Sequence, residues 1–312
     1  MTNVESVVPE SFSYVTDEVA ISRRLGLDIK DPIRVFTLEG LCVDQSRFIR
    51  ELGATFADLP WDIYDLKLDQ TQFLARCFPS QKKRLDDFYD DYHLNRMTLH
   101  DVADLLGRLS SARRHQFDEL EPFRRRAIAK FRLSRPTGPG PWAIDRVPAQ
   151  AFAQEVEGSD VRALKRVFDE AEDAVTGHRE FLKLLGALGS LVGSLRAGAR
   201  ELSLTMHQVS IIADADTLGD NSPEGIHKDG ADFIVSALVI AREGITGGQS
   251  VIYGPDKETE YLRFELQPGQ GIFQADASSS LWHDVTPIRL PPRGAGEEGK
   301  RDIFGFDIDV AG

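Results

Sequence analysis

The spacing of hydrophobic residues changes in character along the chain. After residue 201, short apolar or alternating runs are separated by Gly, Pro, Asp and Asn. Such alternation is typical of β-strands, because successive side chains point to opposite faces of a sheet. Several short strands with turn residues between them predict a β-sandwich or barrel in this part of the chain. The predicted strands are 204–213, 233–240, 250–253, 262–266, 271–274 and 303–310.

Earlier parts of the chain show mainly helical spacing. Apolar residues recur three or four positions apart in 44–59 and across 69–120, which predicts a set of amphipathic helices. The leucine-rich stretch 161–199 has the same spacing and is expected to form two helices that meet near Thr176. We expect these two helices to cover one face of the sheet. A short strand is also predicted at 34–39.

The segment 123–133 is predicted to be a strand that carries several basic residues. One face of this strand would hold Arg124, Arg126, Ile128 and Lys130, and the other Arg125, Ala127, Ala129 and Phe131. One interpretation is a basic face in contact with solvent. The functional alternative is that Arg126 reaches into a pocket and binds a carboxylate with its planar guanidinium group.

These patterns predict an α+β protein in two parts. Residues 1–120 are expected to form a mainly helical N-terminal region, and residues 121–312 a β-rich catalytic domain with covering helices at about 161–199. A chain of 312 residues with 41% hydrophobic content can bury a large core.

Composition narrows the classes of partner. The formal net charge is −13, from 37 basic and 50 acidic residues, which argues against a nucleic-acid partner. The two cysteines, Cys42 and Cys77, form no C-x-x-C motif and favour neither a disulfide framework nor a zinc knuckle. The N-terminus lacks a basic stretch followed by an apolar one, and no run of about 18 apolar residues occurs. We therefore expect a cytoplasmic protein with no membrane partner.

The candidate metal ligands are two histidines and one aspartate. His227 and Asp229 are two residues apart, just before the apolar run 232–241, so both side chains would face the same side of a strand. His283 is the third candidate. Two histidines and one carboxylate that leave open coordination positions are the ligand set of non-haem Fe(II) oxygenases. The alternative is that His227 ends a strand at the surface and His283 packs beside Trp282.

Arg301 is the candidate for binding a 2-oxo acid. The last strand would place Arg301, Ile303 and Gly305 on one face and Phe304, Phe306 and Ile308 on the other. The apolar face would pack under helices, so Arg301 would point into the interior. A buried arginine without an anion is costly, and the far carboxylate of an iron-bound 2-oxo acid would supply that anion.

Five segments carry a resemblance to a known family: Met206-His-Gln-Val-Ser-Ile, Pro223-Glu-Gly-Ile-His-Lys-Asp-Gly, Gly247-Gly-Gln-Ser, Trp282-His-Asp-Val-Thr-Pro-Ile and Lys300-Arg-Asp-Ile-Phe. In this order they resemble the 2-oxoglutarate/Fe(II) dioxygenase family that contains isoleucine 4-hydroxylase and other free-amino-acid hydroxylases. The resemblance covers about residues 120–310 and implies a double-stranded β-helix (jelly roll). It also implies Fe(II), 2-oxoglutarate and O2, with His227, Asp229 and His283 on iron and Arg301 on the C5 carboxylate of 2-oxoglutarate. Ser210 stands where the isoleucine hydroxylase has an arginine.

The function implied by this resemblance is oxidation of an unactivated C–H bond of a free amino acid, most simply its hydroxylation. Oxidative decarboxylation of 2-oxoglutarate to succinate and CO2 would accompany it. Cyclisation or desaturation of the amino acid by the same iron-based oxidant remains an alternative, as does a carrier-bound or peptide substrate. A non-catalytic metal-binding β-barrel sensor is a further alternative, which Arg301 disfavours because a sensor does not need to bind an oxo acid.

An amino acid substrate needs a cation for its carboxylate and an anion for its ammonium group. Arg126 is our candidate for the first, and Glu224 or Asp232 for the second. A turn-capping role for Glu224 and a surface position for Asp232 are the alternatives.

Two further residues are candidates for lining the substrate pocket. Gln208 would face the interior if His207 faces outward, and Tyr253 would contribute its hydroxyl group unless it is only a sheet aromatic. We thus expect a small-molecule amino acid as the partner, with a homodimer left open.

Overall fold

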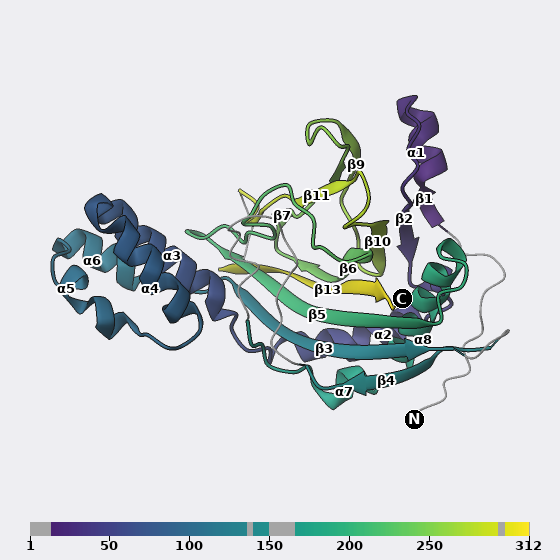
Figure 1. Cartoon of the computed structure of the whole chain (residues 1–312), viewed down its shortest axis with the longest axis horizontal. Coiled ribbons are helices and arrows are strands. Elements are labelled where there is room, and N and C mark those ends of the chain that lie inside the picture. Colours follow the sequence, from purple (N-terminus) through teal and green to yellow (C-terminus); the bar gives the residue numbers. More distant parts are fainter. Residues whose placement is uncertain (1–13, 136–139, 150–165, 293–296, 312) are drawn as a thin grey trace.

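An eight-stranded antiparallel sheet forms the centre of the protein in the computed structural model, which describes residues 14–135, 140–149, 166–292 and 297–311 (Figure 1). Strands from both ends of the chain contribute to this sheet. In spatial order they are β1 (Tyr14–Asp17), β2 (Ile33–Thr37), β10 (Gln270–Ala275), β6 (Phe233–Glu243), β13 (Glu298–Val310), β5 (Glu201–Asp214), β3 (Arg124–Ser134) and β4 (Ala143–Val147).

Two small sheets lie on one side of the large one (Figure 1). One contains β11 (Trp282–Val285), β8 (Ser250–Tyr253) and β9 (Glu260–Phe264), and the other β12 (Ile288–Arg289) and β7 (Thr246–Gly247). Buried apolar side chains of the large sheet, including Val35 and Ile272, pack against Ile252 and Leu262 of the three-stranded sheet. Burial of this apolar surface holds the two sheets together.

Helices cover the opposite face of the large sheet. The two main ones are α2 (Gln45–Gly53), followed by the short 3-10 helix η2 (Ala54–Phe56), and α8 (Arg179–Leu195). The ring of Phe304 on β13 contacts Phe48, Phe56 and Phe181 at centroid distances of 6.0, 5.1 and 5.7 Å. Aromatic pairs of this kind contribute about 0.5–1.5 kcal/mol each beyond their buried area. The apolar face predicted for the last strand is therefore the one that packs under helices.

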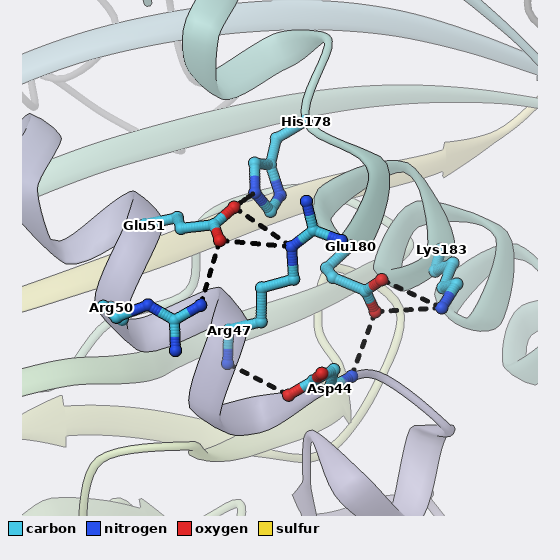
Figure 2. Close-up of polar contacts among 7 residues, drawn as sticks. All are labelled: Asp44, Arg47, Arg50, Glu51, His178, Glu180 and Lys183. Carbon is cyan, nitrogen blue, oxygen red and sulfur yellow. Dashed lines mark hydrogen bonds and ion pairs between the residues drawn. The ribbon is translucent and has the colours of Figure 1, made fainter.

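Hydrogen bonds and ion pairs connect α2 to the N-terminal end of α8 (Figure 2). The backbone N–H of Asp44, the residue before α2, donates to Glu180 Oε2 at 3.0 Å. His178, the residue before α8, places its Nε2 atom 2.9 Å from Glu51 Oε2. Glu180 is nearly fully buried and also accepts two hydrogen bonds from Lys183, so its charge is compensated.

The helices between residues 63 and 118 form a lobe at one end of the molecule (Figure 1). This lobe contains α3 (Ile63–Cys77), α4 (Lys82–His93), α5 (Ala103–Leu106) and α6 (Ser111–Asp118), with the 3-10 helices η3 (Pro79–Gln81) and η4 (Leu99–Val102). It has its own apolar cluster, around Leu74, Phe88 and Phe117. Asp62 begins α3 by accepting a hydrogen bond from the backbone N–H of Tyr64 at 3.1 Å.

The observed elements agree with the predicted mixture of helices and strands. Residues 14–37 add β1 and β2 to the large sheet, joined by α1 (Glu18–Leu25), so the helical N-terminal part also contributes to the β-core. The 3-10 helix η1 (Glu39–Leu41) follows β2. No helix in the described part of the chain is long and apolar enough to cross a membrane.

One helix prediction was wrong in extent. Helix was expected over 161–199, but within the described residues it starts only at α7 (Asp173–Thr176), which Gly177 separates from α8. Residues 161–165 lie outside the described ranges. The backbone of Asp169 and Ala171 instead exchanges hydrogen bonds with Ile128 of β3, at 3.0 and 2.7 Å. Pairing with the sheet edge has overridden the helical spacing of this segment.

Candidate active site

The two histidines and the aspartate predicted as metal ligands come together between the sheets. His227, in the loop that precedes β6, pairs with His283 of β11 through two backbone hydrogen bonds of 2.9 and 3.0 Å. Asp229 places Oδ1 3.5 Å from His227 Nε2 and Oδ2 3.3 Å from His283 Nε2. One ligand atom from each residue lies within 4.8 Å of the others, so a single ion can reach all three.

Neighbouring groups orient these side chains. His227 Nδ1 lies 2.7 Å from the carbonyl oxygen of Gly225, which can only accept, so Nδ1 carries a proton and Nε2 faces Asp229. Asp276, fully buried behind His283, accepts a hydrogen bond from the backbone N–H of Gly230 at 2.7 Å. These contacts hold the three ligands in one geometry without using the atoms that would bind metal.

The electrostatics of the site favour a cation. Burial lowers the pKa of His227, but the hydrogen bond and charge of Asp229, together with Glu224, outweigh burial and raise this pKa to about 9. Although burial raises the pKa of Asp229, the two histidines hold it well below its usual range. A metal ion would take the place of the proton on His227, so metal binding should release protons.

Arg301 meets the expectation of a buried cation beside this site. It lies on β13, is fully buried, and donates from Nη1 to Asn221 Oδ1 at 2.9 Å. Its Nε and Nη2 atoms have no hydrogen-bond partner among the described residues. Burial, with the nearby charge of Arg242, lowers the pKa of Arg301 to about 9. The residues therefore fit the carboxylate of an oxo acid, which would satisfy both the charge and the two N–H groups.

The turn at Gly247 and Gly248 brings backbone close to Arg301. Both have positive φ, 84° and 65°. A Cβ atom on Gly248 would lie 3.0 Å from Cδ of Arg301, and one on Gly247 would lie 2.1 Å from the carbonyl oxygen of Pro287. Only residues without a side chain allow this close approach.

The metal candidates and Arg301 line the same cavity, of about 210 Å³. Its walls come from the inner faces of β3, β5, β6 and β13, from β11 and from the loop 221–229. The helical lobe closes one side with Asp65 and Leu68 of α3. The cavity thus lies where the large sheet, the small sheets and the lobe meet.

Charged residues concentrate at the wall next to the lobe. Arg124 of β3 forms an ion pair with Asp65, and its Nε atom lies 3.4 Å from Asp62 Oδ2. Although burial lowers the pKa of Arg124, these two carboxylates outweigh it and raise the pKa. Arg124 is thus neutralised by the lobe and holds the lobe against the sheet.

Two of the predicted substrate residues line the cavity. Arg126 hydrogen-bonds through Nη2 to His207 Nδ1 at 2.8 Å, and its guanidinium lies 4.5 Å from the ring centre of Phe168. Glu224 places Oε1 3.0 Å from His227 Nε2, beside the metal candidates. The structure therefore brings one cation and one carboxylate of the predicted set into the cavity.

The prediction for Gln208 was wrong because the faces of β5 are reversed. His207, Val209 and Ile211 line the cavity, while Gln208 turns to the helical layer and donates to Thr55 Oγ1 at 2.8 Å. Most of β5 is buried on both faces, so hydrophobicity does not indicate which face is inward.

Asp232 and Tyr253 do not line the cavity. Asp232 accepts a hydrogen bond from the backbone N–H of Val310 at 2.9 Å, at the edge where β6 meets β13. Tyr253 lies at the end of β8 opposite Trp282, the outward neighbour of His283. Tyr253 is thus a sheet aromatic, and Asp232 links the start of β6 to the end of β13.

Five ionisable residues of the cavity wall were not predicted from the sequence. Arg124 and Asp307 lie on the same strand faces as Arg126 and Arg301, so the predicted faces already contained them, whereas finding His207 needed the correct choice of face for β5. Asp65 and Arg166 carry no such signal, because tertiary packing alone brings their segments to the cavity.

Comparison with protein families agrees with the geometry. A family model described as 2OG-Fe dioxygenase matches residues 113–307. The chain belongs to this family. The 2OG-Fe dioxygenase family uses Fe(II), 2-oxoglutarate and O2, and His227, Asp229 and His283 are able to bind the iron. The expectation of an oxidoreductase is confirmed.

Several solved structures are similar to this 2OG-Fe dioxygenase, and the first described below shares its fold. A bsmA homolog (Mpe_A2762) from Methylobium petroleophilum PM1 is 24% identical, with a TM-score of 0.52 over 62% of this chain and 74% of that one. IDO from Bacillus thuringiensis is 14% identical, with a TM-score of 0.46 over 61% and 76%. The Fe(II)/(alpha)ketoglutarate-dependent dioxygenase TqaL is 16% identical, with a TM-score of 0.44 over 77% and 89%. A comparison with curated proteins gave no match.

Proposed function

We propose that this dioxygenase oxidises an unactivated C–H bond of a free amino acid, with hydroxylation as the main outcome. The observation that carries the proposal is one cavity that joins the three metal candidates, the buried Arg301, and a cation and a carboxylate, Arg126 and Glu224. Its volume of about 210 Å³ is below the roughly 300–1,000 Å³ typical of sites for drug-sized ligands, which favours a small substrate.

In this proposal His227, Asp229 and His283 hold Fe(II), and Arg301 binds the C5 carboxylate of 2-oxoglutarate. Bound iron, with 2-oxoglutarate and O2, supplies the oxidant for an unactivated C–H bond. The chain itself excludes water from Arg301 by burial and orients His227 through Gly225. Both effects would fix the position of 2-oxoglutarate relative to the metal ligands before the substrate enters.

Arg126 is the proposed partner of the substrate carboxylate because it lines the cavity and its largely buried charge would be stabilised by an anion there. Burial lowers the pKa of Arg126 to about 10, with Arg124 and Arg166 acting in the same direction against Asp62. Asp62 lies 3.9 Å from Arg126, farther than from Arg124. An additional anion, such as a substrate carboxylate, would stabilise this cation.

Glu224 is the proposed partner of the ammonium group. Its position 3.0 Å from His227 Nε2 would place that group close to the metal and the rest of the amino acid along the cavity toward Arg126. Positioning of the target carbon decides between hydroxylation and other outcomes, since an error of about 1 Å can cost of the order of a hundredfold in rate.

The fold assignment is part of the same proposal. We assign the β-core to the double-stranded β-helix (jelly roll), supported by a large antiparallel sheet that faces two smaller sheets across the cavity. We further propose that the lobe of α3 to α6 limits substrate size, since Asp65 and Leu68 close one side of the cavity.

A panel of free proteinogenic amino acids tests the substrate class. We expect one of them to stimulate succinate formation from 2-oxoglutarate and to give a product heavier by one oxygen atom. In the Arg126→Ala variant, the KM for this amino acid should rise about 10- to 150-fold. This is the effect of losing about 1.5–3 kcal/mol from a hydrogen bond to a charged group. The KM for 2-oxoglutarate should stay unchanged.

Arg132→Ala is the matched control, because Arg132 lies on the same strand but is exposed and paired with Glu201. It should leave both KM values unchanged. A product lighter by two hydrogen atoms would indicate desaturation or cyclisation. No stimulation by any free amino acid, with 2-oxoglutarate still bound, would contradict the proposed substrate class and point to a carrier-bound or peptide substrate.

A further inference from the structure

A chain of three polar side chains crosses the inner face of the large sheet. Arg126 of β3, His207 of β5 and Asp307 of β13 lie on adjacent strands, and all three line the cavity. His207 Nδ1 lies 2.8 Å from Arg126 Nη2, and His207 Nε2 lies 2.9 Å from Asp307 Oδ2. His207 therefore bridges the other two side chains.

The chemistry of these partners determines the tautomer of His207. An arginine can only donate hydrogen bonds, so Nδ1 of His207 must accept and cannot carry a proton. The imidazole is then neutral, and its proton lies on Nε2 and is donated to Asp307. Burial and the charge of Arg126 also lower the pKa of His207 well below its ordinary value. Burial and Asp229 raise the pKa of Asp307 to about 8, and Oδ2 can accept in either protonation state.

Because His207 is a neutral acceptor, it affects Arg126 differently from a carboxylate. His207 fixes the direction of the Arg126 guanidinium without cancelling its charge, whereas a carboxylate would compete with a substrate anion. The ring of Phe168, 4.5 Å from the guanidinium, restricts its plane. Arg124 differs in its nearest acceptors, which are carboxylate oxygens of Asp65 and Asp62.

We propose that His207 and Asp307 are positioning residues, which hold Arg126 in the orientation that binds the substrate carboxylate. Asp307 fixes the ring and tautomer of His207, and His207 fixes Arg126. This inference rests on the proposed role of Arg126 in substrate binding. It assigns a function to the histidine of the segment Met206-His-Gln-Val-Ser, whose inward position was not predicted from the sequence.

A pair of His207 variants separates acceptor loss from general disruption. His207→Phe keeps a ring but removes the acceptor, and it should raise the KM for the amino acid by about tenfold or more, as expected for one hydrogen bond to a charged group. His207→Asn retains an acceptor, because Oδ1 of asparagine is bonded to Cγ as Nδ1 of histidine is. This variant should therefore have a KM for the amino acid between those of His207→Phe and the wild type. The KM for 2-oxoglutarate should be unchanged in both. Equal KM values for the amino acid in His207→Phe and wild type would overturn the proposal.

A double-mutant cycle tests whether His207 acts through Arg126. In the Arg126→Ala background, His207→Phe should have no further effect on the KM for the amino acid, because the group it positions is gone. Additive effects would mean that His207 contacts the substrate itself, and would overturn the positioning role. If Arg126→Ala alone has no effect, the proposed role of Arg126 fails instead, so the two failures are distinguishable.

The tautomer gives a readout that needs no substrate. In ¹⁵N-labelled protein at neutral pH, the side-chain signals of His207, assigned by their loss in His207→Phe, should show a proton on Nε2 and none on Nδ1. Arg126→Ala should weaken this preference, because nothing then requires Nδ1 to accept. A doubly protonated ring, or a proton on Nδ1, in the wild-type protein would overturn the proposal even if no amino acid proves to be a substrate.

Discussion

The Asp229→Ala variant is expected to lose both Fe(II) binding and turnover. Asp229 lies between the two histidines, 3.5 Å from one and 3.3 Å from the other, and is the negatively charged member of the proposed ligand set. Loss of a group that only supports a metal ligand costs about 10- to 100-fold in affinity or activity. Loss of the ligand itself should therefore reduce succinate formation by more than about 100-fold. Bound iron after anaerobic loading and the rate of succinate release are the two measurements.

Asp284→Ala provides the matched control for this experiment. Asp284 follows His283 on β11 and faces the opposite side of the strand, so its carboxylate does not line the cavity. We expect wild-type iron content and turnover in this variant. Wild-type iron affinity in Asp229→Ala, with the protein folded, would remove Asp229 from the ligand set.

The Arg301→Met variant is expected to lose affinity for 2-oxoglutarate while it keeps its fold. Methionine fills similar space without a charge, and replacing a buried charge by an apolar group of similar volume is often neutral or stabilising. The oxo acid, in contrast, would lose the partner of its carboxylate. Truncating one member of a buried charge pair costs about 2–5 kcal/mol, or about 30- to 4,000-fold in KM.

Thermal unfolding measures this effect without catalysis. A ligand that binds only the folded protein raises the melting temperature, so 2-oxoglutarate should stabilise the metal-loaded wild type and not Arg301→Met. Arg289→Met, at an exposed position on β12, should behave as the wild type. An unchanged stabilisation by 2-oxoglutarate in Arg301→Met would show that its carboxylate binds elsewhere.

The metal candidates could be found from the sequence because their signal is local. His227 and Asp229 are two residues apart, and Arg301 stands just before the predicted strand 303–310. The inward direction of Arg301 followed from the apolar residues that alternate with it on β13, since Phe304 and its neighbours need the helical layer.

Other features of the site depend on information that is not local. Most of β5 is buried on both faces, so the inward position of His207 follows only from its pairing with β3 and β13. The ion pairs that join Asp62 and Asp65 to Arg124 link segments about 60 residues apart, and no spacing in the sequence signals them. The segment 166–172 has helical spacing but pairs with β3, because its backbone finds partners there.

The fate of oxygen from O2 tests directly whether this protein couples oxidation of an amino acid to decarboxylation of 2-oxoglutarate. The wild-type protein, loaded with Fe(II) and given 2-oxoglutarate and a stimulating amino acid, would be exposed to ¹⁸O-labelled dioxygen, and the succinate analysed by mass spectrometry. We expect one heavy oxygen atom in succinate, and a second in the amino acid product if the reaction is hydroxylation. Succinate without label, or succinate formed equally well without O2, would contradict this coupling.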